Sequence, residues 1–410
     1  MHNLHVKNTV RYYLLLVIAL VFLFFSGNFG LIDVQKTAIV MAVGIDREGE
    51  DFIVTSQIAV PEASKQGNAS QTVQLVSRGK TVANALEEIN GKTGWYPKLA
   101  FCRLIILGEK ATETDVFDSL DFFLVNEYIS DNCLIATCES TAQDLLNVTA
   151  LIDPSGSVAM QKVLSPHAER VGAVLPTTLR EFSIGYFSDS KSGYMPLLKT
   201  QPQQEKQGEE KQNNASQGQG GAQNSSQNSQ NQGGQAEKSG QEKPVFSANE
   251  TALFVAGKRV GVLTPEETFA VNATLFELKL ASYTVESDKG ACTLIIRNNQ
   301  RKEKLVVKSD IPAYKIKLTL TAGFADASFS RPLQETKDAG AIPSGVFPQA
   351  EKLLASQVKD AFEKCRAVDC DIFGVKERIQ KYNAKAYKRL KNTALSSAVL
   401  DISVTFQGVR

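Results

Sequence analysis

Hydrophobic and polar residues alternate along most of the chain, and their period distinguishes strands from helices. Thr37 to Asp46 is almost continuously apolar, and Asp51 to Val60 alternates, with a glycine-containing turn between the two runs. Two strand-like runs joined by a short turn predict a β-hairpin. The acidic residues of this turn lack the spacing of a calcium-binding loop, so we interpret it as a solvated turn.

Helical periodicity begins after this hairpin. Thr81 is a suitable N-cap, its helix is expected to end at Gly91, and a second helix is expected over 110–126. Strands and helices that intermix in this way predict an α+β region over residues 33–200, of one or two subdomains. The other elements expected in it are strands at 71–77, 101–107 and 133–138, and short helices that start at Thr141 and cover 158–164 and 177–182.

The composition changes abruptly at residues 201–245. Gln201 to Lys243 is almost entirely Gln, Asn, Gly, Ser, Glu and Lys, with no aromatic and no β-branched residue. Such a segment cannot bury enough apolar surface to offset the entropy lost on ordering. We therefore predict a disordered linker here, either between domains or inserted into a surface loop.

Regular patterning resumes in a C-terminal α+β domain predicted over 246–410. Thr264 followed by Pro265 is a strong helix start, and strand-like runs at 283–286, 292–297, 304–307 and 314–321 predict an antiparallel meander. A long helix over 348–366, a second and basic helix that continues to Lys391, and a last strand over 398–406 complete the domain. The residues expected to face inward from the long helix are Leu353, Leu354, Val358, Ala361 and Phe362.

The segment Tyr12–Phe25 contains no charged residue, and the apolar character continues to Ile32. A run of this length suffices to cross a bilayer, so we predict a transmembrane anchor over 12–32, after a cytoplasmic tail over 1–11. Lys7 and Arg11 favour a cytoplasmic N-terminus and an extracytoplasmic body of two or three domains. A cleaved signal peptide is the alternative, although cuts after Gly27 or Gly30 leave unsuitable residues three positions upstream.

Composition and motifs argue against most kinds of chemistry. The net charge of +1 gives no field that would attract nucleic acid. None of the six cysteines forms a CxxC pair, and His167 is the one histidine of the body, so no catalytic, metal or cofactor site is expected. Cys365 and Cys370 are candidates for a short-loop disulfide, with free buried thiols as the alternative.

Four segments resemble the Ger(x)C family, the C subunits of spore germinant receptors. They are the run Ala38–Asp46 with its Gly-Ile-Asp ending, the strand-turn-strand around Thr251–Phe254 and Lys258–Leu263, the Asp371–Gly374 element between two helices, and the closing strand that ends near Gly408. Their order and spacing resemble those of the family from about Ile32 to the C-terminus.

The resemblance implies a non-catalytic, membrane-anchored subunit that acts in receptor assembly and signal relay during spore germination. It further implies two integral-membrane partner subunits and a place on the outer face of the spore inner membrane. Members usually carry a lipid-modified cysteine just after the apolar run, whereas this chain has Asn28, so no lipidation is expected. The helix itself would then hold the protein in the membrane.

A candidate interaction surface lies in the Asp371–Gly374 element and the basic helix after it, where positive charges suit lipid headgroups or an acidic partner. An anchored extracytoplasmic enzyme, such as a cell-wall hydrolase with paired carboxylates, and a solute-binding module are the alternatives. The residues of the candidate surface are Asp371, Phe373, Gly374, Lys376, Arg378, Lys381 and Lys388.

Overall fold

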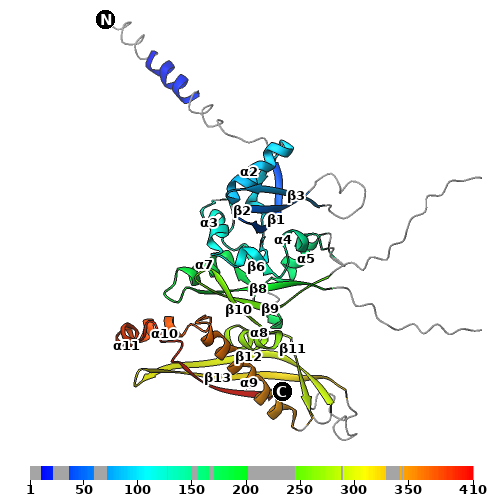
Figure 1. The fold of residues 1–410 in the computed structure, drawn as a ribbon, viewed down its shortest axis with the longest axis vertical. Coiled ribbons are helices and arrows are strands. Elements are labelled where there is room, and N and C mark those ends of the chain that lie inside the picture. The colour runs from blue at the N-terminus through cyan, green and yellow to red at the C-terminus, as the bar shows by residue number, and fades with distance from the viewer. Residues whose placement is uncertain are drawn as a thin grey trace, which may run out of the picture.

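Two β-sheets, with helices between and around them, form the body of the protein (Figure 1), which confirms the α+β class. The computed structural model describes residues 11–21, 37–59, 72–126, 128–148, 153, 155–165, 170–201, 245–287, 290–328, 342–343 and 345–409. Asn28, His167 and residues 202–244 of the predicted linker lie outside these ranges.

Residues 11–21 are helical. No helix within the described ranges combines the length and apolar character needed to cross a membrane. Residues 22–32 of the predicted anchor are outside those ranges, and the anchor stays a prediction.

The first sheet has ten strands and builds on the predicted hairpin. β1 (Thr37–Glu48) pairs antiparallel with β2 (Asp51–Ala59), which confirms that prediction. The main order is β10-β9-β8-β6-β5-β1-β2-β3, while β4 pairs with β1 and β7 with β6. The remaining strands are β3 (Thr72–Gly79), β4 (Tyr96–Lys98), β5 (Leu104–Leu107), β6 (Leu134–Cys138), β7 (Thr177–Thr178), β8 (Ser192–Gln201), β9 (Val245–Val255) and β10 (Lys258–Leu263).

Side-chain caps start the helices of this part of the chain. Thr81 caps α2 (Val82–Thr93), Thr141 caps α4 (Ala142–Leu146), and both hydroxyls accept a backbone N–H three residues on. The predicted end of α2 at Gly91 is wrong, because Gly94 adopts a φ of 73° and its N–H closes the last turn. The other elements are η3 (Leu99–Phe101), η4 (Glu109–Thr112), α3 (Phe117–Val125), α5 (Gly156–Val163) and α7 (Leu179–Phe187).

The low-complexity tract divides the sequence but not this sheet. β8 and β9, on either side of it, pair antiparallel with Gln201 opposite Val245. β10 then pairs with β9 as the edge strand. The strands just after the tract therefore complete the sheet that the preceding half begins.

The second sheet has four strands in the order β11-β12-β13-β14. The predicted strands at 292–297 and 304–307 are one strand, β12 (Gly290–Lys308), because the polar residues between them are exposed ladder residues and no turn interrupts it. The predicted antiparallel meander is confirmed with three strands, because β11 pairs antiparallel with β12 and β12 with β13 (Ile311–Ala327). The closing strand β14 (Val399–Gly408) then pairs parallel with β13. The first strand is β11 (Ala281–Ser287).

Helices α8 (Pro265–Leu275) and α9 (Val346–Ala367) pack against each other between the two sheets (Figure 1). Four of the five α9 residues predicted to face inward are buried, but Leu353 is 36% exposed and was wrongly predicted. The predicted basic helix is two helices, α10 (Val375–Tyr382) and α11 (Ala384–Leu390). Asn383 interrupts it, because its side chain accepts the N–H of Ala386 and caps α11.

The continuous sheet predicts that the tract is dispensable for folding. We expect a chain in which residues 203–243 are replaced by a four-residue Gly/Asn turn to keep its free energy of unfolding or gain up to about 2 kcal/mol, since loop closure costs less entropy over a shorter loop. Urea unfolding of the two full-length proteins measures the difference. A large loss of stability would contradict the direct β8–β9 pairing.

Candidate interaction site

The Asp371–Gly374 turn joins α9 to α10 and lies at the junction of the two halves. Gly374 adopts a φ of 71°, a left-handed conformation that disfavours other residues. A Cβ at this position would lie 2.7 Å from Nη1 of Arg378, so glycine also leaves room for that guanidinium. Both the backbone conformation and the position of the Arg378 side chain therefore favour glycine at position 374.

The carboxylate of Asp371 is buried and caps α10. Its Oδ1 accepts the N–H of Val375 at 2.8 Å, and its Oδ2 accepts the N–H of Lys376 at 2.7 Å. The N–H of Asp371 itself donates to Ser192 Oγ on β8 at 2.8 Å. Burial raises the pKa of the Asp371 carboxyl, although the two backbone N–H groups oppose the rise. One residue therefore starts α10 and attaches it to the first sheet.

Buried groups on either side of Asp371 strengthen this junction. The Phe373 ring packs edge-on against Phe362 of α9, with centroids 5.3 Å apart. The Cys370 thiol donates to the carbonyl of Phe254 on β9, and burial raises the pKa of this thiol to about 12. All six cysteines are described, and all are buried free thiols, so the Cys365–Cys370 disulfide is not formed.

Asp46, from the first of the family-like segments, has the same role in the other half. Its carboxylate accepts the N–H groups of Ala142 at 2.8 Å and Gln143 at 3.1 Å, at the start of α4. Burial raises the pKa of this carboxyl too. The acidic residue of each motif is thus a helix cap, Asp371 for the helix that follows it and Asp46 for a helix distant in sequence, which argues against a role in paired-carboxylate catalysis.

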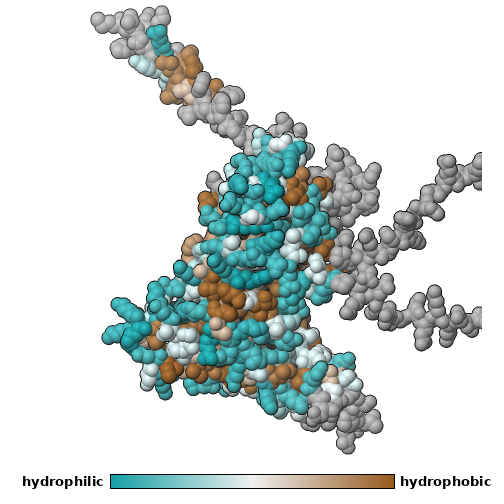
Figure 2. All heavy atoms as spheres, in the orientation of Figure 1, coloured by the Kyte–Doolittle hydropathy of each residue, from teal (hydrophilic) through white to brown (hydrophobic). Residues whose placement is uncertain are grey.

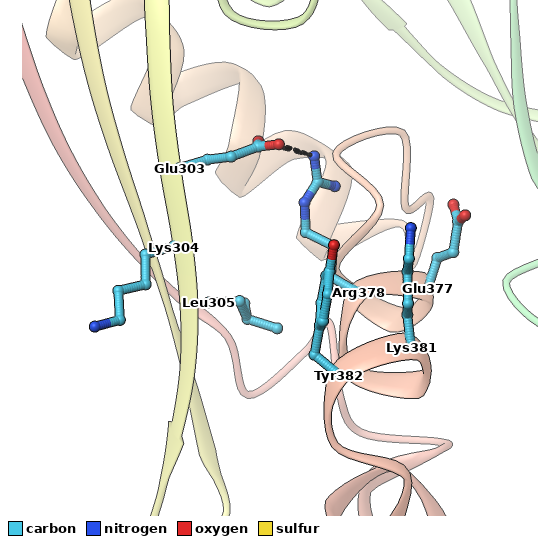
Figure 3. A pocket seen from close by; sticks show the side chains of 7 residues that line it. All are labelled: Glu303, Lys304, Leu305, Glu377, Arg378, Lys381 and Tyr382. Atoms are coloured by element: carbon cyan, nitrogen blue, oxygen red, sulfur yellow. Dashed lines mark hydrogen bonds and ion pairs between the residues drawn. The ribbon is translucent and has the colours of Figure 1, made fainter.

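Arg378 extends from α10 to β12 and closes one end of a groove (Figure 3). Its Nη2 contacts both carboxylate oxygens of Glu303 at 2.8 Å, and the Tyr314 hydroxyl donates to the same carboxylate at 2.6 Å. Burial opposes ionisation of Glu303, but the bonds from Arg378 and Tyr314 outweigh it and lower the pKa of the carboxyl. The groove measures about 520 Å³ and is lined by Glu303, Lys304, Leu305, Glu377, Arg378, Lys381 and Tyr382.

The candidate surface predicted from the sequence is only partly a surface. Asp371, Phe373 and Lys376 are buried, and Lys376 pairs with Asp369 at 3.0 Å. Gly374 and Arg378 are half-buried, whereas Lys381 and Lys388 are exposed.

Ion pairs also neutralise much of the predicted basic face. Arg389 pairs with Asp310 at 2.7 Å and Lys391 with Asp189 at 3.4 Å. Within the described ranges, the helix cations that form no ion pair are Lys381, Lys385 and Lys388.

A second groove, of about 670 Å³, separates α7 and the start of β8 from α10. Ile184 is 62% exposed and Phe187 is 71% exposed on its α7 side. Asp189, in the loop before β8, links this loop to α10 and α11. Its carboxylate accepts hydrogen bonds from the Tyr387 hydroxyl at 2.6 Å and from the Gln380 amide at 3.1 Å. Figure 2 shows further hydrophobic side chains across the middle of the body, at the level of β9 and β10.

Sequence reasoning did not identify the α7 residues of this groove. Leu179 and Phe182 form the buried face of α7, and Ile184 and Phe187 fall outside that face at helical spacing. Apolar residues outside the buried face of α7 were the sequence signal that could have identified this groove. The described residues contain no cluster of side chains suited to hold a metal ion.

Comparisons with known proteins agree across both halves. A family described as "Spore germination protein N-terminal domain" matches residues 31–200, and one described as "Spore germination B3/ GerAC like, C-terminal" matches residues 249–407. The crystal structure of the GerBC protein superposes with a TM-score of 0.51 at 13% identity, over 90% of this chain and 97% of that chain. At this identity the superposition concerns the fold. No curated protein matches the sequence.

The cap geometry predicts that Asp371 is essential for stability. We expect Asp371→Ala to lower the free energy of unfolding by about 3 kcal/mol, because it removes a cap and leaves two buried N–H groups without acceptors. Urea unfolding of the full chain measures this change, with the exposed Lys388→Ala as the matched control, expected within about 0.5 kcal/mol of wild type. Equal stability of the two variants would argue against the cap.

The raised pKa of Asp371 predicts a dependence on pH. A carboxyl with a folded pKa above its ordinary value of 3.8 contributes stability that is present below 3.8 and is lost as the pH rises through the folded pKa. The difference in unfolding free energy between wild type and Asp371→Asn should therefore decrease as the pH rises above 3.8. Denaturant unfolding at a series of pH values tests this, and an increasing difference would refute it.

Proposed function

The chain belongs to the spore germination GerAC family, and from this premise we propose that it is the membrane-anchored, non-catalytic C subunit of a germinant receptor. Membership of the family implies a role in spore germination. The proposal adds that the subunit acts in assembly and signal relay, beside two integral-membrane subunits at the outer face of the spore inner membrane.

The observation that carries this proposal is that the residues of the family-like segments have structural roles. Asp46 and Asp371 cap helices, and Phe373 fills the core between α9 and the turn. Side chains committed in this way hold a scaffold together and are not available for substrate chemistry. The arrangement therefore favours a protein that works through its surfaces.

We assign partner binding to the exposed sides of α10 and α11 and to the grooves on the two flanks of α10. Lys381, Lys385 and Lys388, which form no ion pair with any described residue, offer positive charge, and Ile184 and Phe187 offer apolar contact area nearby. An interface that combines apolar anchors with charge suits an acidic protein surface.

The junction between the layers supports a role in relay. Asp371 and Asp189 connect α10 and α11 to β8 and to the loop before it through direct hydrogen bonds. A displacement of α10 by a partner would alter these bonds and so bias the position of one layer against the other.

The anchor completes the proposal. With Asn28 where relatives usually have the lipid-modified cysteine, the segment 12–32 is left to hold the body at the membrane. The body would then lie outside the cytoplasm.

Reversing the free charges should weaken assembly without unfolding the protein. We expect Lys381→Glu/Lys388→Glu to lower co-purification of the two multi-span subunits from spore membranes by about tenfold, because charge reversal repels an acidic surface. The spores should germinate more slowly in response to germinant.

Lys359→Glu, a charge reversal on the exposed side of α9, is the control and should leave both readouts unchanged. Normal co-purification of the double variant at normal abundance would contradict the assigned surface.

A further inference from the structure

Exposed aromatic side chains gather at the end of the first sheet where β1 begins. Trp95 is 44% exposed, Tyr96 46% and Phe101 53%. We propose that this end of the body rests on the lipid bilayer through a membrane patch made of Trp95, Tyr96, Lys98, Phe101 and Arg103.

The patch lies next to the start of β1. β4 runs parallel to β1 with Tyr96 beside Thr37, and neighbouring strands are about 4.8 Å apart. The inference rests on the proposed anchor over 12–32, from which four residues lead to Thr37. Even fully extended, this stretch keeps Thr37 within about 18 Å of the end of the span. The headgroup layer is then within reach of the membrane patch.

Local structure holds the aromatic residues in outward positions. Gly94 ends α2 in a left-handed conformation, and its N–H donates to Asn90 O at 2.7 Å. The N–H of Trp95 donates to Thr93 Oγ1 at 3.1 Å. Phe101 closes the short helix η3 between the buried residues Leu99 and Cys102. The side chains are thus presented by a fixed turn and a short helix.

The chemistry of the membrane patch suits a lipid interface. Tryptophan and tyrosine favour the boundary between hydrocarbon and water, where the ring is buried and the polar atom stays hydrated. Lys98 and Arg103 are exposed, and neither forms an ion pair within the described ranges. Each cation near an anionic membrane adds about 1 kcal/mol of attraction. Charge and apolar area therefore favour a bilayer with anionic lipids.

The membrane patch and the proposed partner surface are well separated. α10 and α11 lie at the level of α8, between the two sheets and away from the start of β1 (Figure 1). The start of β1 can therefore face lipid while the side that carries α10 binds a protein partner.

The single tryptophan of the chain makes this inference directly testable. The full-length protein is reconstituted into vesicles of phosphatidylcholine and phosphatidylglycerol that carry a nitroxide on the headgroup, and tryptophan emission is recorded after vesicle flotation. The control is Trp95→Phe/Tyr382→Trp, which moves the fluorophore to an exposed position on α10.

We expect quenching of Trp95 to be at least about twice that of position 382, with blue-shifted emission, since an interfacial indole lies at headgroup depth. Lys98→Glu/Arg103→Glu should reduce this quenching in anionic vesicles. A chain that floats with vesicles but shows equal quenching at both positions overturns the membrane patch and leaves the anchor standing. A chain that does not float overturns both.

Discussion

Asp371 is the residue on which the arrangement of the two halves depends, because its buried carboxylate caps α10 while its backbone N–H bonds to the first sheet. Taking a carboxylate out of water is costly, and two backbone N–H groups at the start of α10 offset much of that cost. The adjacent N–H bonds to Ser192 of β8, so the same residue fixes where α10 begins and what it packs beside. In the first half, the buried carboxylate of Asp46 likewise accepts two backbone N–H groups at the start of α4. Each motif thus stabilises a helix start within a contact between distant segments.

Because the motif residues have structural roles, the family resemblance reports on the scaffold of the protein. The Asp371–Gly374 element is recognisable because its geometry is demanding, with a buried cap, a left-handed glycine and a ring in the core. Residues under such constraints specify the scaffold. The residues that remain available to partners, Lys381 and Lys388, have no comparable structural constraint and carry little signal in the sequence. Recognition of a family from its motifs therefore gave the fold more directly than the binding surface.

The layered body separates the proposed membrane patch from the proposed partner surface. The start of β1 and the aromatic turn beside it are close to the proposed anchor, and α10 with its two grooves lies between α7 of the first half and β12 of the second sheet. Helices α8 and α9 fill the space between the sheets, and polar bridges such as that of Asp189 connect the layers at the edge. Close packing of this kind would let the body carry the displacement of α10 proposed above, because its interior does not deform freely. That property suits a subunit that relays a signal between a membrane and its partners.

Local patterns by themselves determined the hairpin of β1 and β2, the caps at Thr81 and Thr141, and the buried face of α9, because each depends on residues close in sequence. They also determined the abrupt change at the low-complexity tract. Only the tertiary structure decided that β9 and β10 complete the first sheet, that β12 continues through its polar middle, and that β14 runs parallel to β13. It likewise decided that Lys376 and Arg378 form ion pairs, while Lys381 and Lys388 form none within the described residues. Strand pairing and ion pairing join residues far apart in sequence, and no local period encodes which partner a strand or a charge will meet.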